Sequence, residues 1–558
     1  MFGTMRSALF AIAGCVLLTQ SSLAADGVSG NLVTVNWLEK HLQNADVLIL
    51  DASPAQLYNE NHVPGAVNVD MLAYGRPEIP AAEMEKTLRS WGVSPGKSIV
   101  MYDQGGNMMA TRVFYSLYYY GFPVKDLFIV DGGFYKWQSA GLPMTKESTP
   151  VAKPGSFTIA NLNRDAKAEL PEVLTATGDP ANNALVEGLD ANWHFGGVAA
   201  FNRVGHIPTG IVLPSNDFYN PDKTFKSPEE LRKMLTYFNI KPEQRIYTYC
   251  GGGVAASVPY FAIKFILNYP SVKLYEDSEL GWLRDERELP YWTYDAPYLM
   301  RDTAWLRFWG GGMLRSFGAS HVSIVDVRPP AAYEQGHIPF AVNIPGEVFE
   351  SNLPNPRKMV EILGQAGVDP SQEAVVVSGA GLTKESALAF AVLEKFKQTK
   401  VSVFMDSLEK SAQLGFAPTK EPTVVGAKKS PADLAVPAVT YPFSARRTVI
   451  TSNLTPGVYP RVFIASGKNL PTQAQDGKMI QVPYTNLVNA DGTPKAAKDI
   501  WSILTKAGVP RYAQLVFVSD DPGEAAVNYF IFKLMGFPDL RIWVSDCGCA
   551  LLGPESGN

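Results

Sequence analysis

One unit of sequence recurs along the 558 residues of this chain, and it constrains the fold more than any other feature. In the first copy, an apolar run at 48–51 ends in an acid, a turn with His62-x-Pro follows, and a second apolar run at 99–102 leads through a glycine-containing loop into an apolar helix. The second runs of the later copies, the last of them degraded, are 246–249, 375–377 and 516–518. Copies spaced at domain length predict separate domains rather than a solenoid.

Apolar runs bounded by Gly and Pro alternate with helical stretches such as 110–120 and 387–396. This alternation predicts an α/β fold in which each copy is a parallel sheet with helices on both faces. The four domains are expected at 30–147, 155–292, 300–420 and 440–552. Polar, Pro-containing joints separate them at 145–156, 291–301 and 419–446, and the last is long enough to be a flexible linker over part of its length.

Composition and charge exclude several classes of protein. Hydrophobic residues make up 46% of the chain and charged residues 18%, which is typical of packed globular domains. The 49 Lys and Arg against 54 Asp and Glu give a net charge of −5, and no dense basic run predicts a nucleic-acid partner. Four cysteines in a chain of this length exclude a disulfide scaffold.

The N-terminus has the pattern of a secretory signal peptide over residues 1–24. Arg6 precedes an apolar run at 8–18, and Ser22-Leu23-Ala24 offers small residues for cleavage. Two alternatives are a buried N-terminal helix and a lipobox that would place a lipid on Cys15. No later run is long enough to span a bilayer, so we expect an exported mature chain, periplasmic in a Gram-negative source.

Cys250 stands where an open parallel sheet binds its ligands, directly after the apolar run 246–249. Gly251, Gly252 and Gly253 follow it, and a helix is expected from about residue 255. Glycines let backbone N–H groups converge, and a helix N-terminus adds positive potential, so this setting favours a reactive thiolate and an anionic substrate. A small buried cysteine at a strand end is the alternative interpretation.

The repeat resembles the rhodanese domain, and the segment 250–256, Cys-Gly-Gly-Gly-Val-Ala-Ala, resembles the rhodanese active-site loop. The first two copies resemble a tandem rhodanese whose inactive N-terminal domain carries Asp, here Asp103, in the Cys position. The resemblance implies sulfur transfer: Cys250 attacks a sulfur donor, becomes a persulfide and passes the sulfur to an acceptor nucleophile. It implies no metal or organic cofactor. A phosphatase loop is excluded because the sixth residue after Cys250 is Ala256, where Arg is required.

The loop resembles the mercaptopyruvate type more than the thiosulfate type, but it carries the complete signature of neither. The run through Gly253, Val254 and Ala255 resembles the mercaptopyruvate type more than the thiosulfate type, although hydroxyl residues of that type are replaced. The resemblance also implies that His62 and Asp51 assist Cys250, with ordinary turn chemistry as the alternative. The family's carboxylate-binding Arg is missing from its usual place at Glu187-Gly188, which leaves Arg203 as the candidate to hold a substrate anion or to be a surface charge. His194 lies near the same segment.

The third and fourth copies have no thiol in the Cys position, since Ser378 and Ser519 stand there. Serine is a poor nucleophile without a base, so both copies are expected to be non-catalytic. Cys547 and Cys549, one residue apart, could form a strained, labile disulfide that exchanges sulfur with Cys250, or a passive pair.

Together these features predict an exported sulfurtransferase that moves sulfane sulfur from thiosulfate or 3-mercaptopyruvate to cyanide or a thiol through a Cys250 persulfide. Its partners would be a small-molecule donor and acceptor, with a protein thiol as a further acceptor. The alternative is a scaffold of four rhodanese modules that binds partners of an exported sulfur or redox pathway, since three of the four copies lack the nucleophile.

Overall fold

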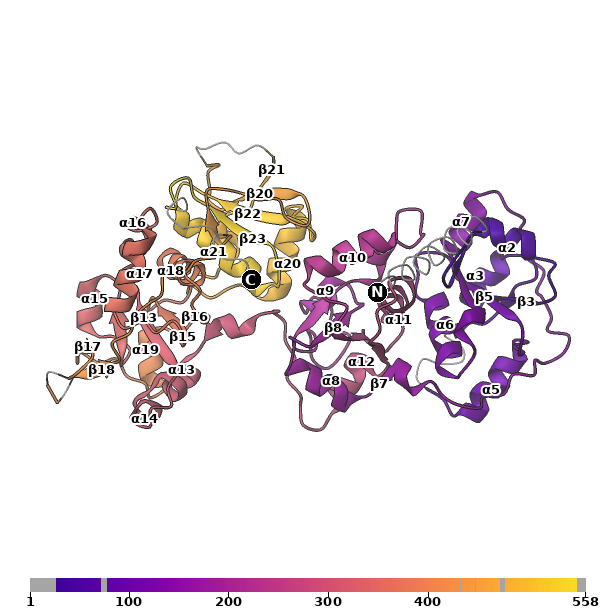
Figure 1. Cartoon of the computed structure of the whole chain (residues 1–558), viewed down its shortest axis with the longest axis horizontal. Helices are drawn as coiled ribbons and strands as arrows, with labels where there is room; N and C mark the ends of the chain where they lie inside the picture. Colours follow the sequence, from indigo (N-terminus) through magenta and orange to yellow (C-terminus); the bar gives the residue numbers. More distant parts are fainter. Residues whose placement is uncertain are drawn as a thin grey trace, which may run out of the picture. The chain divides into compact units, whose positions relative to one another are not determined.

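The computed structural model describes residues 27–71, 78–428, 430–431, 433–446, 448–471 and 477–548. The predicted signal peptide, with Cys15, lies outside these residues, as does Cys549. The chain forms two compact units, one up to Trp292 and the other from Thr293 (Figure 1). No described helix is both long and apolar enough to cross a membrane.

Among the described residues, each unit contains two sheets with five parallel strands, and these four sheets share one strand order. In the first unit these are β2-β6-β5-β3-β4, extended by the antiparallel β1, and β7-β11-β10-β8-β9. In the second unit they are β12-β16-β15-β13-β14 and β19-β23-β22-β20-β21. We refer to them in chain order as the first to fourth sheets, and the common order is the structural counterpart of the sequence repeat. Their strands are, in chain order, β1 (Val28–Ser29), β2 (Leu32–Val33), β3 (Val47–Asp51), β4 (Val67–Asn68), β5 (Ser98–Tyr102), β6 (Leu127–Val130), β7 (Lys167–Ala168), β8 (Asn183–Glu187), β9 (Gly210–Val212), β10 (Arg245–Tyr249), β11 (Val272–Tyr275), β12 (Met300–Arg301), β13 (Val322–Asp326), β14 (Ala341–Asn343), β15 (Glu373–Val377), β16 (Lys400–Phe404), β19 (Ile450–Thr451), β20 (Arg461–Ala465), β21 (Lys478–Gln481), β22 (Gln514–Val518) and β23 (Leu540–Trp543).

Central strands such as β8, β13 and β22 are buried along their whole length. Helices therefore cover both faces of these sheets. The helices of the first unit are α2 (Val35–His41), α3 (Ala55–Glu60), α5 (Ala81–Ser90), α6 (Met109–Tyr119), α7 (Gly133–Ser139), α8 (Leu170–Thr177), α9 (Ala191–His194), α10 (Pro228–Tyr237), α11 (Ser257–Phe261) and α12 (Ser278–Arg284). Those of the second unit are α13 (Thr303–Gly310), α14 (Gly312–Ser316), α15 (Pro330–Gln335), α16 (Gly346–Ser351), α17 (Pro356–Gln365), α18 (Lys384–Lys395), α19 (Leu408–Gln413), α20 (Ala497–Lys506) and α21 (Pro522–Leu534).

The predicted elements agree with these bounds to within a few residues. The helices expected at 110–120 and 387–396 are α6 and α18. The joint expected at 419–446 contains a small sheet that the sequence did not predict, in which β17 (Thr423–Val425) pairs in parallel with β18 (Leu434–Val436). Strands of three residues lack the long apolar run that marks a central strand.

Candidate active site

Cys250 directly follows β10, the central strand of the second sheet, which lies between β8 and β11. Its side chain is a free thiol with only 2% of the residue exposed. The carboxyl edge of a parallel sheet is the usual place for a ligand site, so the predicted location of the thiol is the one that the fold provides.

The glycine loop after Cys250 is held against the turn that follows β11. The N–H groups of Cys250 and Gly253 donate to the Ser278 hydroxyl oxygen at 3.0 and 3.1 Å, and that hydroxyl donates to the Tyr275 carbonyl at 2.8 Å. Gly253 has a φ of +80°, and a Cβ there would lie 2.6 Å from the Glu276 carbonyl oxygen. Only glycine fits this approach of two backbones, which explains one glycine of the run.

Four N–H groups of the loop keep their hydrogen-bonding capacity. Among the described residues, the backbone N–H groups of Gly251, Gly252, Val254 and Ala255 have no hydrogen-bond partner. They flank a buried thiol, where an anion would otherwise be poorly solvated. Such donors can stabilise a thiolate, a persulfide anion or an anionic group of a substrate.

An acidic cluster lies beside this loop on the second sheet. Glu187 and Glu279 are 0% and 1% exposed, and Glu187 receives hydrogen bonds from the Tyr249 hydroxyl at 3.3 Å and from Nδ1 of His194. The backbone N–H of Glu279 donates to the Cys250 carbonyl oxygen at 3.0 Å, which places this buried acid next to the loop. Burial, followed by the charge of Glu187, raises the pKa of Glu279 to about 11.

The structure holds His62 and Asp51 through contacts in the first sheet's own fold. The ring nitrogens of His62 lie 2.8 Å from the Tyr58 carbonyl oxygen and 3.1 Å from that of Glu147. Asp51 accepts a backbone N–H of its own turn at 2.8 Å, and burial raises its pKa. Among the described contacts, neither side chain hydrogen-bonds to Cys250. Their assistance to the thiol stays a prediction.

In each of the first three copies, the histidine of the repeated turn stacks on another aromatic ring. His62 stacks on Tyr58 at 3.7 Å and His337 on Tyr333 at 3.8 Å, and in the second sheet His206 stacks on His194 at 3.5 Å. Burial lowers the pKa of His206 well below its ordinary value. The shared stack is a packing feature of the fold.

Arg203 is half-buried and held away from solvent on one side. Its Nη1 donates to the Leu289 carbonyl oxygen at 2.8 Å, and its guanidinium lies 5.7 Å from the centre of the Tyr291 ring. The described contacts of Arg203 are therefore with Leu289 and Tyr291, and none of them is with the glycine loop. A role in holding a substrate anion remains a prediction.

In the other three sheets, the side chain at the position of Cys250 forms hydrogen bonds with residues that follow it closely in the chain. The Asp103 carboxylate accepts the N–H groups of Gly105 and Ala110 at 2.8 and 2.9 Å. The Ser378 hydroxyl donates to the Gly381 carbonyl at 2.6 Å, and the Ser519 hydroxyl donates to a nearby carboxylate at 2.6 Å. Each of these side chains closes its own loop.

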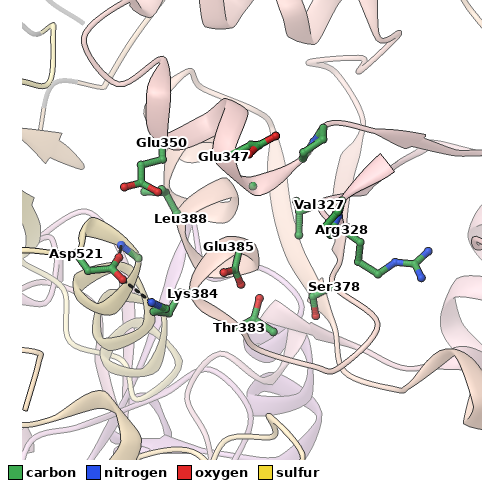
Figure 2. A pocket seen from close by; sticks show the side chains of 14 residues that line it. Val327, Arg328, Glu347, Glu350, Ser378, Thr383, Lys384, Glu385, Leu388 and Asp521 are labelled. Carbon is green, nitrogen blue, oxygen red and sulfur yellow. Dashed lines mark hydrogen bonds and ion pairs between the residues drawn. The ribbon is translucent and has the colours of Figure 1, made fainter. Parts of the chain in front are cut away.

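The third sheet nevertheless keeps a cavity of about 390 Å³ at its carboxyl edge, beside Ser378 (Figure 2). Its charged groups are partly neutralised, since Lys384 pairs with Asp521 and Arg328 pairs with Asp326. No lining side chain is a thiol, although the hydroxyls of Ser378 and Thr383 contribute to the wall. The cavity is lined by Val327, Arg328, Pro329, Pro345, Gly346, Glu347, Glu350, Ser378, Thr383, Lys384, Glu385, Leu388, Asp521 and Gly523.

Cys547 is buried and disulfide-bonded. Its carbonyl oxygen accepts a hydrogen bond from the Lys395 ammonium at 3.0 Å. Because Cys549 lies outside the described residues, exchange of sulfur between this region and Cys250 stays a prediction.

Comparison with known proteins decides the family. A model of the rhodanese-like domain matches residues 34–140 and 313–413, which contain most of the first and third sheets. The sulfur carrier protein TtuD of Thermus thermophilus is 30% identical over 45% of this chain and 93% of its own length. The chain belongs to the rhodanese family.

Two further relatives of this rhodanese carry enzyme names. A putative thiosulfate sulfurtransferase of Synechococcus elongatus is 31% identical over 46% of this chain and 83% of its own length. A probable 3-mercaptopyruvate sulfurtransferase of Pseudomonas aeruginosa is 29% identical over 46% of this chain and 97% of its own length. The family relationship brings sulfurtransferases of both donor types close to this chain.

Sequence reasoning missed two residues of the site. The Ser278 hydroxyl oxygen accepts two loop N–H groups, and the N–H of Glu279 donates to the Cys250 carbonyl oxygen. Both lie after the next strand along the chain, β11, and only the parallel pairing of β10 with β11 brings that turn to the loop. One sequence feature could have pointed to them: the acidic Glu279 stands in the first turn of α12, a helix that otherwise covers a core.

Proposed function

We propose that this rhodanese is a sulfurtransferase that carries sulfane sulfur as a persulfide on Cys250. The observation that supports it most is the free, buried thiol at the end of β10, flanked by loop N–H groups that have no other described partner. The names of its relatives support the same reaction class.

In the proposed first step, the Cys250 thiolate attacks the outer sulfur of the donor. A new S–S bond forms while the bond between that sulfur and the rest of the donor breaks, and the leaving group takes the electron pair. With thiosulfate the leaving group is sulfite. With 3-mercaptopyruvate it is the enolate of pyruvate, which takes up the proton of the donor thiol. The free N–H groups of the loop would stabilise the anionic charge on sulfur in both cases.

In the second step, an acceptor such as cyanide or a thiol attacks the terminal sulfur and regenerates the Cys250 thiolate. We propose the loop from Gly251 to Ala255 as the binding site for the transferred sulfur. His62, Asp51 and Arg203 are candidates for assistance that the variants below can test. We further propose an exported protein of four rhodanese modules in which the first, third and fourth sheets do not carry sulfur.

The experiment that tests the proposal is the intact mass of the full chain after incubation with thiosulfate and, separately, with 3-mercaptopyruvate. A mass gain of one sulfur atom that reducing agent reverses is the expected result, and the donor that produces it is the substrate. The same incubation with Cys250→Ser should give no gain. A gain of equal size in that variant would place the sulfur elsewhere and refute the proposal.

A second function is favoured by one observation, the locally bonded Ser378 and Ser519 hydroxyls of the second unit. Modules whose active-site loops close on themselves can serve as binding platforms for partner proteins. In this alternative the whole chain is a scaffold, Cys250 takes up no sulfur from either donor, and partners co-purify with the protein.

A further inference from the structure

A group of exposed apolar side chains lies on α13 and α14, at one edge of the second unit (Figure 1). Phe308 and Trp309 are 50% and 45% exposed, and Met313 and Phe317 are 58% and 78% exposed. The two rings of α13 lie 5.0 Å apart, and the two residues of α14 and its cap stand four positions apart, on one side of that helix. We call these four residues the apolar patch.

The first copy has the matching helix without the patch. α2 follows β2 and α13 follows β12, and the capping side chain of each accepts the N–H of a tryptophan three residues on, at 3.1 and 2.8 Å. Counted from these caps, Phe308 stands where α2 has Lys40, and Trp309 stands where α2 has His41. Between α2 and β3 the first copy has no helix that corresponds to α14. The fold therefore does not require exposed apolar side chains at this place.

The surroundings of the patch carry positive charge. Residues 303–320 include Arg307 and Arg315 and contain neither Asp nor Glu. The Arg307 guanidinium donates to a backbone carbonyl oxygen at 3.0 Å, and that of Arg315 donates to two others at 2.8 and 2.6 Å. Neither guanidinium pairs with an acid among the described residues, and the nearest acid along the chain, Asp302, caps the opposite end of α13. The patch is thus both apolar and cationic.

We propose that the apolar patch docks on the surface of a bilayer that contains anionic lipids. Exposed Trp and Phe rings accompanied by arginines are typical of segments that insert shallowly into the membrane interface. The rings would lie at the level of the headgroups, and the arginines would pair with lipid phosphates. This inference is independent of sulfur transfer by Cys250, since it concerns a surface of the second unit.

Two features of the patch favour a membrane over a second copy of the chain. A two-fold dimer would place identical patches face to face, so the arginines of both copies would meet. The four side chains expose on the order of 500 Å² together, which is less than the roughly 800 Å² that each partner buries in a stable protein interface. The area argument applies equally to a partner protein, whereas a few inserted rings and neighbouring cations are sufficient for reversible membrane binding.

Flotation of the full chain with lipid vesicles tests the proposal. The protein should float with vesicles of phosphatidylcholine and phosphatidylglycerol, and much less with phosphatidylcholine alone or at high salt. Phe308→Lys combined with Trp309→His gives α13 the residues of α2, so this polar α13 variant should fold and should bind the anionic vesicles at least about tenfold more weakly.

The control is Met144→Lys, which replaces an exposed apolar residue of the first unit and should bind as the wild type does. Any binding by the apolar run at the N-terminus is common to all these proteins, so the difference between them reports the patch.

Quenching of tryptophan fluorescence by brominated lipids identifies the face that meets the membrane. The predicted signal peptide contains no tryptophan, so the signal comes from the rest of the chain. Trp309→Phe keeps an aromatic ring and should keep vesicle binding, but it should remove most of the quenching. Unchanged quenching in this variant would show that another face contacts the lipid and would contradict the proposal.

Equal flotation of the wild type and the polar α13 variant, or no flotation with either vesicle, would overturn the proposal. So would a wild-type dimer in analytical ultracentrifugation that the variant loses, because it would assign the patch to a second copy. If the variant does not fold, Met313→Ser combined with Phe317→Ser replaces it, with the same expected loss. Persulfide formation on Cys250 should be unchanged in all of these variants, so its absence from the wild type would count against the proposed function alone.

Discussion

The loops after β5 and β10 accept matching hydrogen bonds from the next turn, Phe134 N–H on the Asp103 carbonyl oxygen and Glu279 N–H on the Cys250 carbonyl oxygen, but they differ in chemistry. After β5, the Asp103 carboxylate accepts two N–H groups of its own loop. After β10, Cys250 has a short side chain, and the N–H of Cys250 itself and that of Gly253 are taken by a hydroxyl from a neighbouring turn. The remaining N–H groups stay available beside the thiol. The loop after β5 is thus closed by its own carboxylate, whereas the loop after β10 keeps N–H groups without a described partner beside a thiol.

The neighbouring turns show the same relationship. Gly133 has a φ of +54° and Ser278 a φ of +51°, so both begin a helix from the left-handed region, which costs a serine more than a glycine. The serine supplies the hydroxyl that the second loop uses as its acceptor. The next residue differs too, since the N–H of Phe134 donates to the Asp103 carbonyl oxygen and the N–H of Glu279 to the Cys250 carbonyl oxygen. The second sheet thus accepts local strain and a buried acid where the first has glycine and an aromatic ring.

The largest expected effect comes from removing the sulfur nucleophile. Cys250→Ser should lower sulfur transfer to cyanide by about three orders of magnitude or more, because a serine hydroxyl cannot take its place without a base. Steady-state assays with each donor measure this loss. Ser378→Ala is the control from the second unit and should keep wild-type activity; a comparable loss there would break the distinction between the sheets.

Glu279, the buried acid at the place that Phe134 has in the first sheet, should make the stability of the protein depend on pH. Because the pKa of Glu279 is raised from 4.5 to about 11 by folding, the unfolded chain releases this proton first, and stability falls as the pH rises through this interval. Glu279→Gln cannot ionise, so it should be more stable than wild type by about 2 to 4 kcal/mol at pH 8 and nearly equal at pH 5.

Denaturant unfolding of the protein at pH 5 and at pH 8, followed through the transition of the first unit, measures this difference. Glu286→Gln removes an exposed acid from the turn after α12 and should show no such pH dependence. Equal stability of Glu279→Gln and wild type at pH 8 would mean that the acid is ionised in the folded state.

Backbone geometry should matter for activity in only one of the two loops. Gly253→Ala forces a Cβ against the Glu276 carbonyl oxygen, so the loop must shift and sulfur transfer should fall by about 10- to 100-fold. Gly105→Ala brings a Cβ to 2.3 Å from the Gly132 carbonyl oxygen in the first sheet and should spare activity per folded molecule. Equal losses in both variants would show that the first loop contributes to the reaction.

The smallest effect is expected for the residue that closes the first loop. Asp103→Ala leaves the half-buried N–H of Gly105 and the buried N–H of Ala110 without their acceptor, which should cost about 2 kcal/mol of stability. Thermal unfolding measures the loss, and persulfide formation on Cys250 should continue. A gain in stability would mean that the buried carboxyl group costs more than its hydrogen bonds contribute.

The sequence predicted what depends on runs and local turns. The apolar run before Cys250 predicted its place after a central strand, and Gly253 turned out to need the freedom of a glycine. It did not predict contacts that depend on the packing of neighbouring turns. Nothing near Cys250 in the chain indicates that Ser278 and Glu279 reach it, and His62 resembled a catalytic partner although its described contacts are backbone carbonyls of the first sheet.

Peptide-resolved mass spectrometry of the chain, after loading with thiosulfate or 3-mercaptopyruvate and blocking of free thiols, shows which cysteine carries the sulfur. We expect one added sulfur atom on the peptide that carries Cys250 and none on the peptide that carries Cys547. An unmodified Cys250 peptide with both donors, in protein whose thiol reacts with iodoacetamide, would contradict this expectation.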